Sequence, residues 1–344
     1  MTAGDCHEPT YLIYCKQSSF VLYPVRDFRI DTRPYNSVKM TEASNLAYVM
    51  GHHEYKGIWY PNIVLDSSIE ALQTFEVRPD DVWVVTYPKA GTHWMLEIVG
   101  LILSDGYPEK IDRSSSSTLI EMIDLDQKLP VTKEEEEQNP PDMAPFMEKI
   151  KKAHSPRVIQ THLRLKYMPQ DLLKKAKVIY VGRNPKDTAV SWYKFLKDDV
   201  PLTWESVVQQ AMDGTIEYGP WADHVKEFWE IRQHYDNLLI VFYEDILRDP
   251  VKHTRMVAEH IGRPLSEEVL QRVIENSSLS GMRKTYEKRA KQLKEPGAEL
   301  ARLKFISKGK TGQWKNYFTV AQNELFDEYF RKEMDGVDIK VPFE

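Results

Sequence analysis

The sequence predicts a single α/β domain with a central parallel β-sheet flanked by helices. Apolar runs of strand length occur at 82–87, 157–161, 177–181 and 238–243. Stretches with helical periodicity separate them, and no internal repeat is visible. Strands that alternate with helices of about ten to fifteen residues are typical of a parallel sheet with helices on both faces.

The first apolar run, 82–87, contains Val, Trp, Thr and Tyr without a charge, which predicts a buried strand. A Pro-Lys-Ala-Gly sequence follows it and predicts a tight turn. Apolar residues then recur at helical spacing, so we expect an amphipathic helix over about 93–104.

The next two apolar runs, 157–161 and 177–181, predict the second and third strands. Asn184 and Pro185 then begin a helix, because a proline in the first turn removes no helical hydrogen bond. The run 238–243 predicts the fourth strand, and further helical segments follow it.

Three segments stand apart from this core. Residues 1–39 show no clear periodicity, and we expect a poorly ordered N-terminal extension before a domain at 40–344. Residues 112–156 contain an acidic run and Pro140-Pro141, which predict a mobile surface excursion. Residues 283–310 carry ten Lys and Arg against three Glu. This basic segment is either a solvated helix face or a lid that binds anions.

Composition narrows the possible functions. The 344 residues carry a net charge of −6, which argues against a nucleic acid partner. The two cysteines, Cys6 and Cys15, lie in the extension, so we expect neither a disulfide scaffold nor a metal site in the domain. No apolar run is long enough for a membrane span, and the N-terminus does not resemble a secretory signal. We therefore expect a cytoplasmic protein that does not bind membranes.

The sequence between the first strand and helix can bind an anion. A glycine turn at a helix N-terminus directs backbone N–H groups and the positive end of the helix dipole at one point. Lys89 adds a full charge there, and Thr92 adds a hydroxyl. An ordinary strand-to-helix turn is the alternative. The order differs from a Walker A loop, in which the lysine comes last, and Gly309-Lys310-Thr311 lacks that motif's first glycine. A P-loop kinase is therefore disfavoured.

Five ordered segments resemble the cytosolic sulfotransferases, over about residues 50–340. They are Tyr87-Pro88-Lys89-Ala90-Gly91-Thr92-His93-Trp94, Thr161-His162-Leu163, Arg183-Asn184-Pro185-Lys186-Asp187 through Ser191, Phe242-Tyr243-Glu244-Asp245, and Lys308-Gly309 through Gly312-Gln313-Trp314-Lys315. The resemblance implies a sulfotransferase fold similar to that of the P-loop kinases. It also implies transfer of a sulfuryl group from 3′-phosphoadenosine 5′-phosphosulfate (PAPS) to an acceptor hydroxyl or amine.

The resemblance implies a role for each matching residue in binding the donor, PAPS. Lys89, at the leaving oxygen, would stabilise the charge that develops in the transition state. The 5′ side of the donor would lie against Lys89, Ala90, Gly91, Thr92 and His93. The adenine would lie near Trp94, Tyr243, Ser277 and Leu279. The 3′-phosphate would be bound by Arg183, Ser191, Ser307, Lys308 and Gly309, which favours the lid interpretation of the basic segment.

His162 is the expected general base. An imidazole with an ordinary pKa near 6.5 suits proton removal from an alcohol or phenol at neutral pH. The sequence contains ten histidines, and His162 is singled out because it follows a strand end in the family's Thr-His context. For His224 and most of the others we prefer a structural role.

Several positions depart from the family pattern. Gln160 stands where a lysine is common, Ser307 replaces an arginine, Leu279 replaces a phenylalanine and His93 replaces a threonine. We expect donor affinity to be retained but weaker. The departures at Gln160 and Ser307 also leave open a second function, that of a catalytically weak protein that binds PAPS or its desulfated product, PAP.

Two expectations concern partners. The residues Lys315, Thr319, Val320 and Glu324 match the family's short dimerisation motif, which predicts a homodimer, although Thr319 also suits an ordinary helix N-cap. A small apolar or aromatic acceptor, such as a phenol or steroid, is suggested by Trp59, Tyr60, Met122, Phe146, Met147 and Tyr193, which core packing explains equally well.

Overall fold

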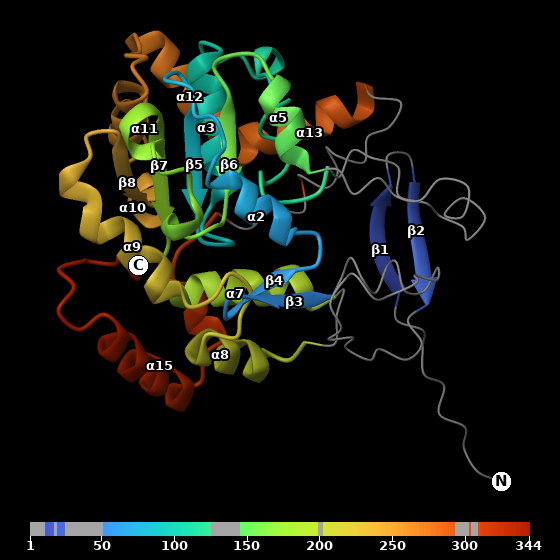
Figure 1. Ribbon diagram of the computed structural model, residues 1–344, viewed down its shortest axis with the longest axis vertical. Helices are drawn as coiled ribbons and strands as arrows, with labels where there is room; N and C mark the ends of the chain where they lie inside the picture. The colour runs from blue at the N-terminus through green and yellow to red at the C-terminus, as the bar shows by residue number, and fades with distance from the viewer. Residues whose placement is uncertain are drawn as a thin grey trace.

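A four-stranded parallel sheet lies at the centre of the protein (Figure 1). The computed structural model describes residues 51–124, 145–198, 202–292, 303 and 309–344, together with the backbone of 11–16 and 19–24. The strands occur in the order β6-β5-β7-β8, and their bounds are β5 (Val82–Thr86), β6 (Val158–Thr161), β7 (Lys177–Gly182) and β8 (Leu238–Phe242). The four predicted strands are confirmed, each to within one residue at either end.

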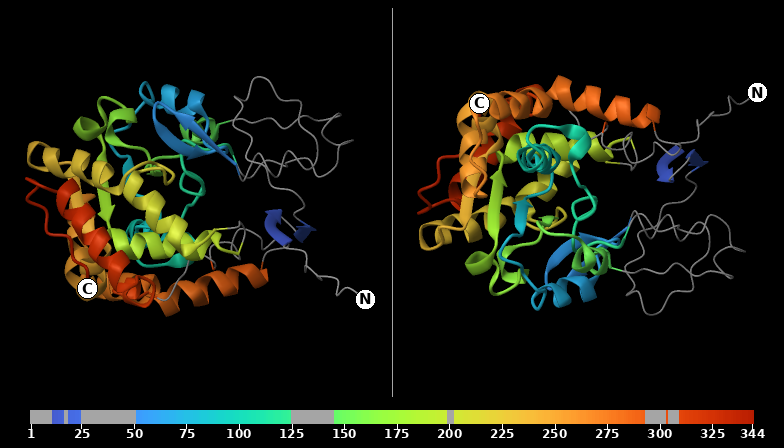
Figure 2. Two further views of the ribbon diagram at one scale, coloured as in Figure 1. Left: turned by 90° about the horizontal axis from the view of Figure 1, so that it is seen from below. Right: turned by 90° about the horizontal axis from the view of Figure 1, so that it is seen from above.

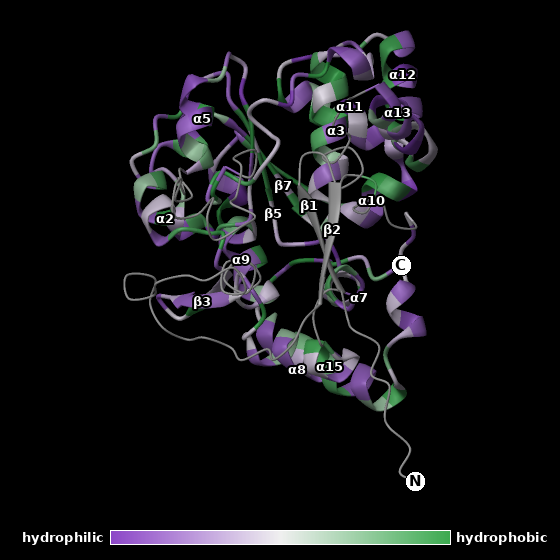
Figure 3. Cartoon of the chain, turned by 90° about the vertical axis from the view of Figure 1, so that its right-hand side faces the viewer, coloured by the Kyte–Doolittle hydropathy of each residue, from purple (hydrophilic) through white to green (hydrophobic). Residues whose placement is uncertain are grey.

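Strand β5 is buried along its whole length because helices cover both faces of the sheet. Trp83 and Val85 belong to one apolar cluster, whereas Val82 and Val84 belong to a second. This division explains why the strand is a continuous apolar run rather than an alternating one. Figure 3 shows the same strand as a hydrophobic element inside polar helix surfaces.

The helices form two layers (Figure 2). The cluster around Val82 and Val84 is closed by α3 (Thr92–Leu103), α10 (Tyr243–Arg248), α11 (Pro250–His260) and α12 (Glu267–Ser277). The helix α13 (Leu279–Gln292) follows α12. The other face is covered by α2 (Asp66–Leu72), α5 (Phe146–Lys152), α6 (Leu172–Lys175), α7 (Pro185–Leu196), α8 (Trp204–Asp213), α9 (Trp221–Ile231) and α15 (Val320–Glu333).

Smaller elements complete the described chain. The strands β3 (His52–Tyr55) and β4 (Ile58–Pro61) form an antiparallel hairpin. Short 3₁₀ turns occur at η2 (Pro108–Lys110), η3 (Leu165–Tyr167), η4 (Arg232–His234) and η5 (Gln313–Asn316).

The prediction of a surface excursion at 112–156 is wrong in part, because several of its described residues reach the core. Ile120, Glu121 and Ile123 are buried, and so are Phe146 and Ile150 of α5. The apolar side chains among them fill the space beside the sheet, which a prediction based on charge runs and prolines overlooked. The acidic run and the two prolines lie in 125–144, outside the described residues.

In the N-terminal region, β1 (Tyr11–Lys16) and β2 (Ser19–Pro24) pair as an antiparallel hairpin, to which the sequence assigned no element. The boundary between 1–39 and 40–344 lies outside the described residues and stays a prediction. Among the residues that the structure describes, no group of histidines, cysteines and carboxylates is arranged to hold a metal ion. None of the described helices combines the length and the apolar character that crossing a membrane requires.

Candidate active site

The loop between β5 and α3 has the shape of an anion cradle. Lys89 and Gly91 both have positive φ angles, of 67° and 111°, and Gly91 is the N-cap of α3. A Cβ atom on Gly91 would lie 2.8 Å from Cδ2 of Tyr243, so the position requires glycine. The positive end of the α3 dipole faces this loop, which suits the loop to an anion.

The Lys89 side chain is held beside this loop. Its Nζ lies 3.7 Å from the centre of the Phe195 ring, and its backbone oxygen accepts a 3.0 Å hydrogen bond from Arg183. Burial, together with the nearby charge of Arg183, lowers the pKa of Lys89 to about 7. The ammonium group is therefore close to its titration point at neutral pH, and an anion bound beside it would favour the charged form.

The residues predicted to bind the rest of the donor form a connected series. The Arg183 guanidinium lies 4.5 Å from the centre of the Tyr243 ring, and that ring packs edge-on against Trp94 at 5.1 Å. Trp94 donates a 2.9 Å hydrogen bond from Nε1 to the backbone oxygen of Ser277. Side chains that follow the ends of β5, β7 and β8 therefore meet the backbone at the end of α12, at one edge of the sheet.

The structure also describes most of the other residues that were predicted to bind PAPS. Ala90 and Thr92 are buried in the cradle loop, and His93 is partly exposed on the first turn of α3. Gly309 approaches Leu279, since a Cβ on the glycine would lie 3.5 Å from that side chain. Ser191 is partly exposed on α7. Ser307 and Lys308 lie outside the described residues.

His162 lies next to the cradle with a defined tautomer. Its Nδ1 is 2.8 Å from the backbone oxygen of Thr86 and 3.0 Å from the Thr86 hydroxyl. A carbonyl oxygen only accepts hydrogen bonds, so Nδ1 carries the proton and Nε2 carries a lone pair. Burial, reinforced by His224 and Lys89, lowers the pKa of His162 to about 3. The ring is therefore neutral at physiological pH, and its pKa lies well below the ordinary value near 6.5 that was expected from the sequence.

Two buried groups hold the backbone of His162. Its N–H donates to Oε1 of Glu121 at 3.0 Å, and its carbonyl accepts a 2.9 Å bond from Nε2 of His224. The Tyr180 hydroxyl in turn lies 2.9 Å from Nδ1 of His224. Burial raises the pKa of Glu121 to about 7 and lowers the pKa of His224 to about 4. His224 is therefore neutral and structural, as expected, and it holds the proposed base.

The surroundings of His162 include residues that the sequence did not identify. The Tyr218 ring packs edge-on against His162 at 5.4 Å, and Tyr60 packs against Tyr218 at 5.3 Å. Glu121 and Tyr218 come from irregular segments, so no strand or helix pattern marks them. Gln160, the departure from the family pattern, is buried and donates a 2.8 Å hydrogen bond to the backbone oxygen of Ser116.

A buried polar network supports the Arg183 side of the site. The two carboxylate oxygens of Asp187 accept 2.8 Å hydrogen bonds from the backbone N–H groups of Gly312 and Trp314. Asn184 caps α7 and donates to Glu244 at 2.7 Å. This network fixes the chain that follows Gly309 against the start of α7.

Comparisons with known proteins identify the family. The family model described as a sulfotransferase domain matches residues 79–338. Mouse sulfotransferase 1A1 is 38% identical over 276 residues, which are 79% of this chain and 90% of that protein. Human sulfotransferase 1C2 is 36% identical over 278 residues, with coverage of 79% and 89%.

Solved structures show the same fold. Mouse sulfotransferase SULT7A1 in complex with PAP matches with a TM-score of 0.67 and 29% identity, covering 83% of this chain and 95% of that one. Retinol dehydratase in complex with androsterone and PAP matches with a TM-score of 0.65 and 25% identity, covering 84% and 90%. The chain therefore belongs to the sulfotransferase family and has the fold and the enzyme class that the family implies.

Proposed function

We propose that this enzyme transfers the sulfuryl group of PAPS to a hydroxyl or amine of a small apolar or aromatic acceptor, with His162 as the general base. The observation that carries this proposal is the bond from Nδ1 of His162 to the Thr86 backbone oxygen, which leaves Nε2 able to accept a proton. The base lies beside a loop shaped to bind an anion, as the reaction requires.

The chain's residues fit the donor. Gly91 lets the Tyr243 ring pack against the loop, and Lys89 and the helix N-terminus supply positive charge on the donor's 5′ side. The Nε atom of Arg183 is buried and has no hydrogen-bond partner among the described residues, so it can donate to a phosphate. Two of the structural neighbours were solved with PAP, which supports the same ligand here.

The proposed step is an in-line displacement at sulfur. The acceptor oxygen or nitrogen forms a bond to sulfur while the bridging S–O bond breaks and its electron pair stays on the 5′-phosphate of PAP. The acceptor proton moves to Nε2 of His162. Lys89 stabilises the charge on the leaving phosphate.

An apolar or aromatic acceptor is supported by an exposed aromatic ring at the site. Phe195 is 39% exposed beside Lys89, whereas Tyr218, which contacts the imidazole, is only 2% exposed and belongs to the core. Of the residues that suggested such an acceptor, Tyr60, Phe146 and Met147 are buried in the core, so packing accounts for them. Trp59, Met122 and Tyr193 keep partial exposure.

One observation favours the second function, that of a weak or inactive protein that binds PAPS or PAP. The Gln160 side chain is neutral, so it supplies no positive charge to the reacting group. Its amide instead donates a hydrogen bond to the backbone oxygen of Ser116. Incubation with radiolabelled PAPS and a panel of phenols, alcohols, steroids and amines separates the two. We expect transfer to at least one acceptor. PAP binding in calorimetry without any transfer would contradict catalysis and leave the binding function.

The homodimer and the cytoplasmic location remain proposals. Val320 is 76% exposed at the start of α15, as a contact residue in a dimer would be before assembly. Thr319 is the N-cap of that helix, and Lys315 pairs with Glu344 of the same chain. Replacing Val320 by Glu should give a monomer in sedimentation analysis, and an unchanged mass would contradict this interface.

A further inference from the structure

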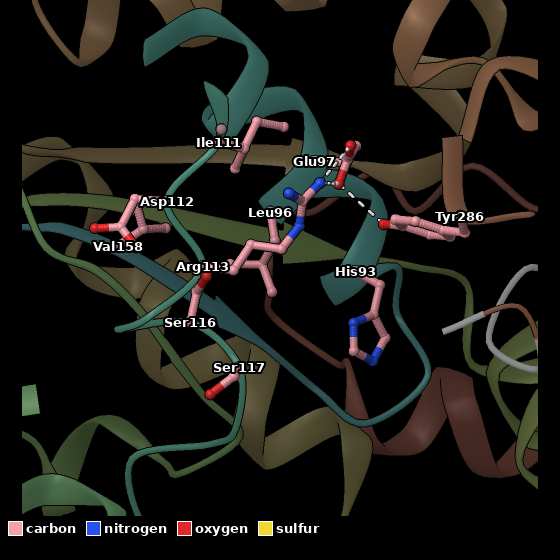
Figure 4. A pocket seen from close by; sticks show the side chains of 11 residues that line it. His93, Leu96, Glu97, Ile111, Asp112, Arg113, Ser116, Ser117, Val158 and Tyr286 are labelled. Atoms are coloured by element: carbon pink, nitrogen blue, oxygen red, sulfur yellow. Dashed lines mark hydrogen bonds and ion pairs between the residues drawn. The ribbon is translucent and has the colours of Figure 1, made fainter. Parts of the chain in front are cut away.

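A buried cluster of three side chains joins α3, the helix that begins at the proposed PAPS-binding loop, to two other segments (Figure 4). Glu97 of α3 accepts two 2.9 Å hydrogen bonds from Nη2 of Arg113, one on each carboxylate oxygen. The Tyr286 hydroxyl of α13 donates a third bond to the same carboxylate, also at 2.9 Å. Only 3% of the Glu97 side chain is exposed. Buried charge-assisted bonds of this kind are strong and directional.

The cluster lies on the same face of α3 as His93, which is proposed to contact PAPS. His93 and Glu97 are four residues apart and line one pocket together with Arg113 and Tyr286. In Figure 4 the His93 ring lies below the Glu97–Arg113 pair, on the same side of the helix. An unpaired carboxylate one turn from the anion cradle would repel an anionic donor, and Arg113 neutralises it.

The close approach of the loop before Arg113 to α3 is set by sequence. A Cβ on Gly100 would lie 2.7 Å from Cγ2 of Ile111, so glycine lets this loop reach the helix. This close approach of the loop to α3 places Arg113 opposite Glu97.

Helix α13 depends on the same cluster. All of its residues are described, and the buried ones are Met282 and Tyr286. At its start Leu279 approaches Gly309, and just before it Ser277 accepts the bond from Trp94. The Tyr286–Glu97 bond therefore fixes α13 to α3 about two turns beyond the place where Trp94 and Ser277 meet.

We propose that Glu97, Arg113 and Tyr286 are positioning residues that hold α3 and α13 in the relative placement needed to bind the donor. This proposal rests on the proposed function, since it assumes that His93, Trp94, Ser277 and Leu279 contact PAPS. The three residues act through those contacts and do not touch the donor themselves.

Tyr286→Phe tests the proposal. It removes one hydroxyl and should raise the calorimetric Kd for PAP about three- to tenfold. Tyr55→Phe is the matched control, because Tyr55 also donates to a glutamate, Glu70 at 3.0 Å, from a hairpin outside the donor site. A loss of folded protein would lower the binding stoichiometry rather than raise the Kd. Backbone amides of α13 should also exchange faster with solvent in Tyr286→Phe.

A second pair of variants tests the charge argument. Arg113→Met leaves the Glu97 carboxylate unpaired and should weaken PAP binding more than Tyr286→Phe does. Adding Glu97→Gln removes that charge and should restore part of the affinity. A Kd and an α13 exchange rate in Tyr286→Phe equal to those of Tyr55→Phe would overturn the proposal, and so would the absence of rescue. If the wild type binds no PAP, the donor assignment fails instead.

Discussion

Nδ1 of His162 lies 2.8 Å from the backbone oxygen of Thr86, the last residue of β5. The Thr86 hydroxyl also lies 2.7 Å from that of Thr92, in the first turn of α3. The proposed base and the proposed donor cradle are therefore aligned by the same residue. Because the base is oriented by a backbone carbonyl, its tautomer does not depend on the side chain at position 86.

Replacing His162 by Asn should lower turnover sharply and leave donor binding intact. The Asn amide can keep the bond that Nδ1 makes to Thr86, but it has no equivalent of Nε2. We expect kcat to fall at least about 100-fold, the ordinary contribution of a general base. Calorimetry should give the same Kd for PAP as in the wild type. Turnover within a few-fold of the wild-type value would remove His162 from the role of base.

The buried Glu121 should make stability depend on pH. Its pKa is raised from 4.5 to about 7, so the folded state binds a proton that the unfolded state has released between these values. Its contribution is present below pH 4.5 and is lost as the pH rises through 7. Glu121→Gln imitates the protonated form. As the pH rises from 5 to 8, the free energy of unfolding of this variant should therefore increase by about 2 kcal/mol relative to that of the wild type. Urea unfolding of both proteins at pH 5 and at pH 8 measures this. A difference in unfolding free energy between variant and wild type that is the same at both pH values would contradict the prediction.

Donor affinity should decline above neutral pH because of Lys89. Its pKa is lowered from 10.5 to about 7, so the free protein loses this charge as the pH rises through 7. Binding of PAP at pH 8 to 9 should then be accompanied by uptake of about one proton. Calorimetry in buffers of different ionisation enthalpy detects the proton. Lys89→Arg stays charged and should show less uptake; equal uptake would mean that another group titrates.

Gly91→Ala should damage the cradle more than an equivalent change elsewhere. The new Cβ would meet the Tyr243 ring at 2.8 Å, at a φ of 111°. Gly262→Ala is the control, since Gly262 has a φ of 71° and no heavy atom within 4 Å of such a Cβ. The control should lose about 1 kcal/mol of stability from its backbone alone and keep its PAP affinity. Gly91→Ala should lose PAP affinity as well, and equal affinities would show that the cradle tolerates a methyl group.

The sequence predicted those parts of the site whose residues lie close together along the chain or directly after a strand. Lys89, Gly91 and Trp94 belong to one strand-to-helix loop, and Arg183 follows a strand that ends at the same edge of the sheet. Trp94 and Arg183 were assigned through the family resemblance, and the parallel topology explains why they lie near each other, because it brings strand ends together.

Glu121 and Tyr218 were missed for a physical reason. Both lie in irregular segments whose path depends on tertiary packing, and neither follows a strand end or a helix period. The stretch around Glu121 was predicted to be surface because of its charged and proline-rich neighbours. Its position is instead fixed by Ile120 and Ile123, which are buried on either side.

Asp187 should control donor affinity without touching the donor. Its two oxygens accept from Gly312 and Trp314, so Asp187→Asn places an amide NH₂ opposite one backbone N–H. We expect a loss of about 1 to 3 kcal/mol of stability from the unsatisfied group, and weaker PAP binding because the chain after Gly309 shifts. Asp213→Asn is the matched control, since Asp213 accepts the backbone N–H of Thr215 at 3.1 Å at the exposed end of α8. Thermal unfolding and PAP titration of both variants check this. If Asp187→Asn loses stability but binds PAP as tightly as the control, the network supports only the fold.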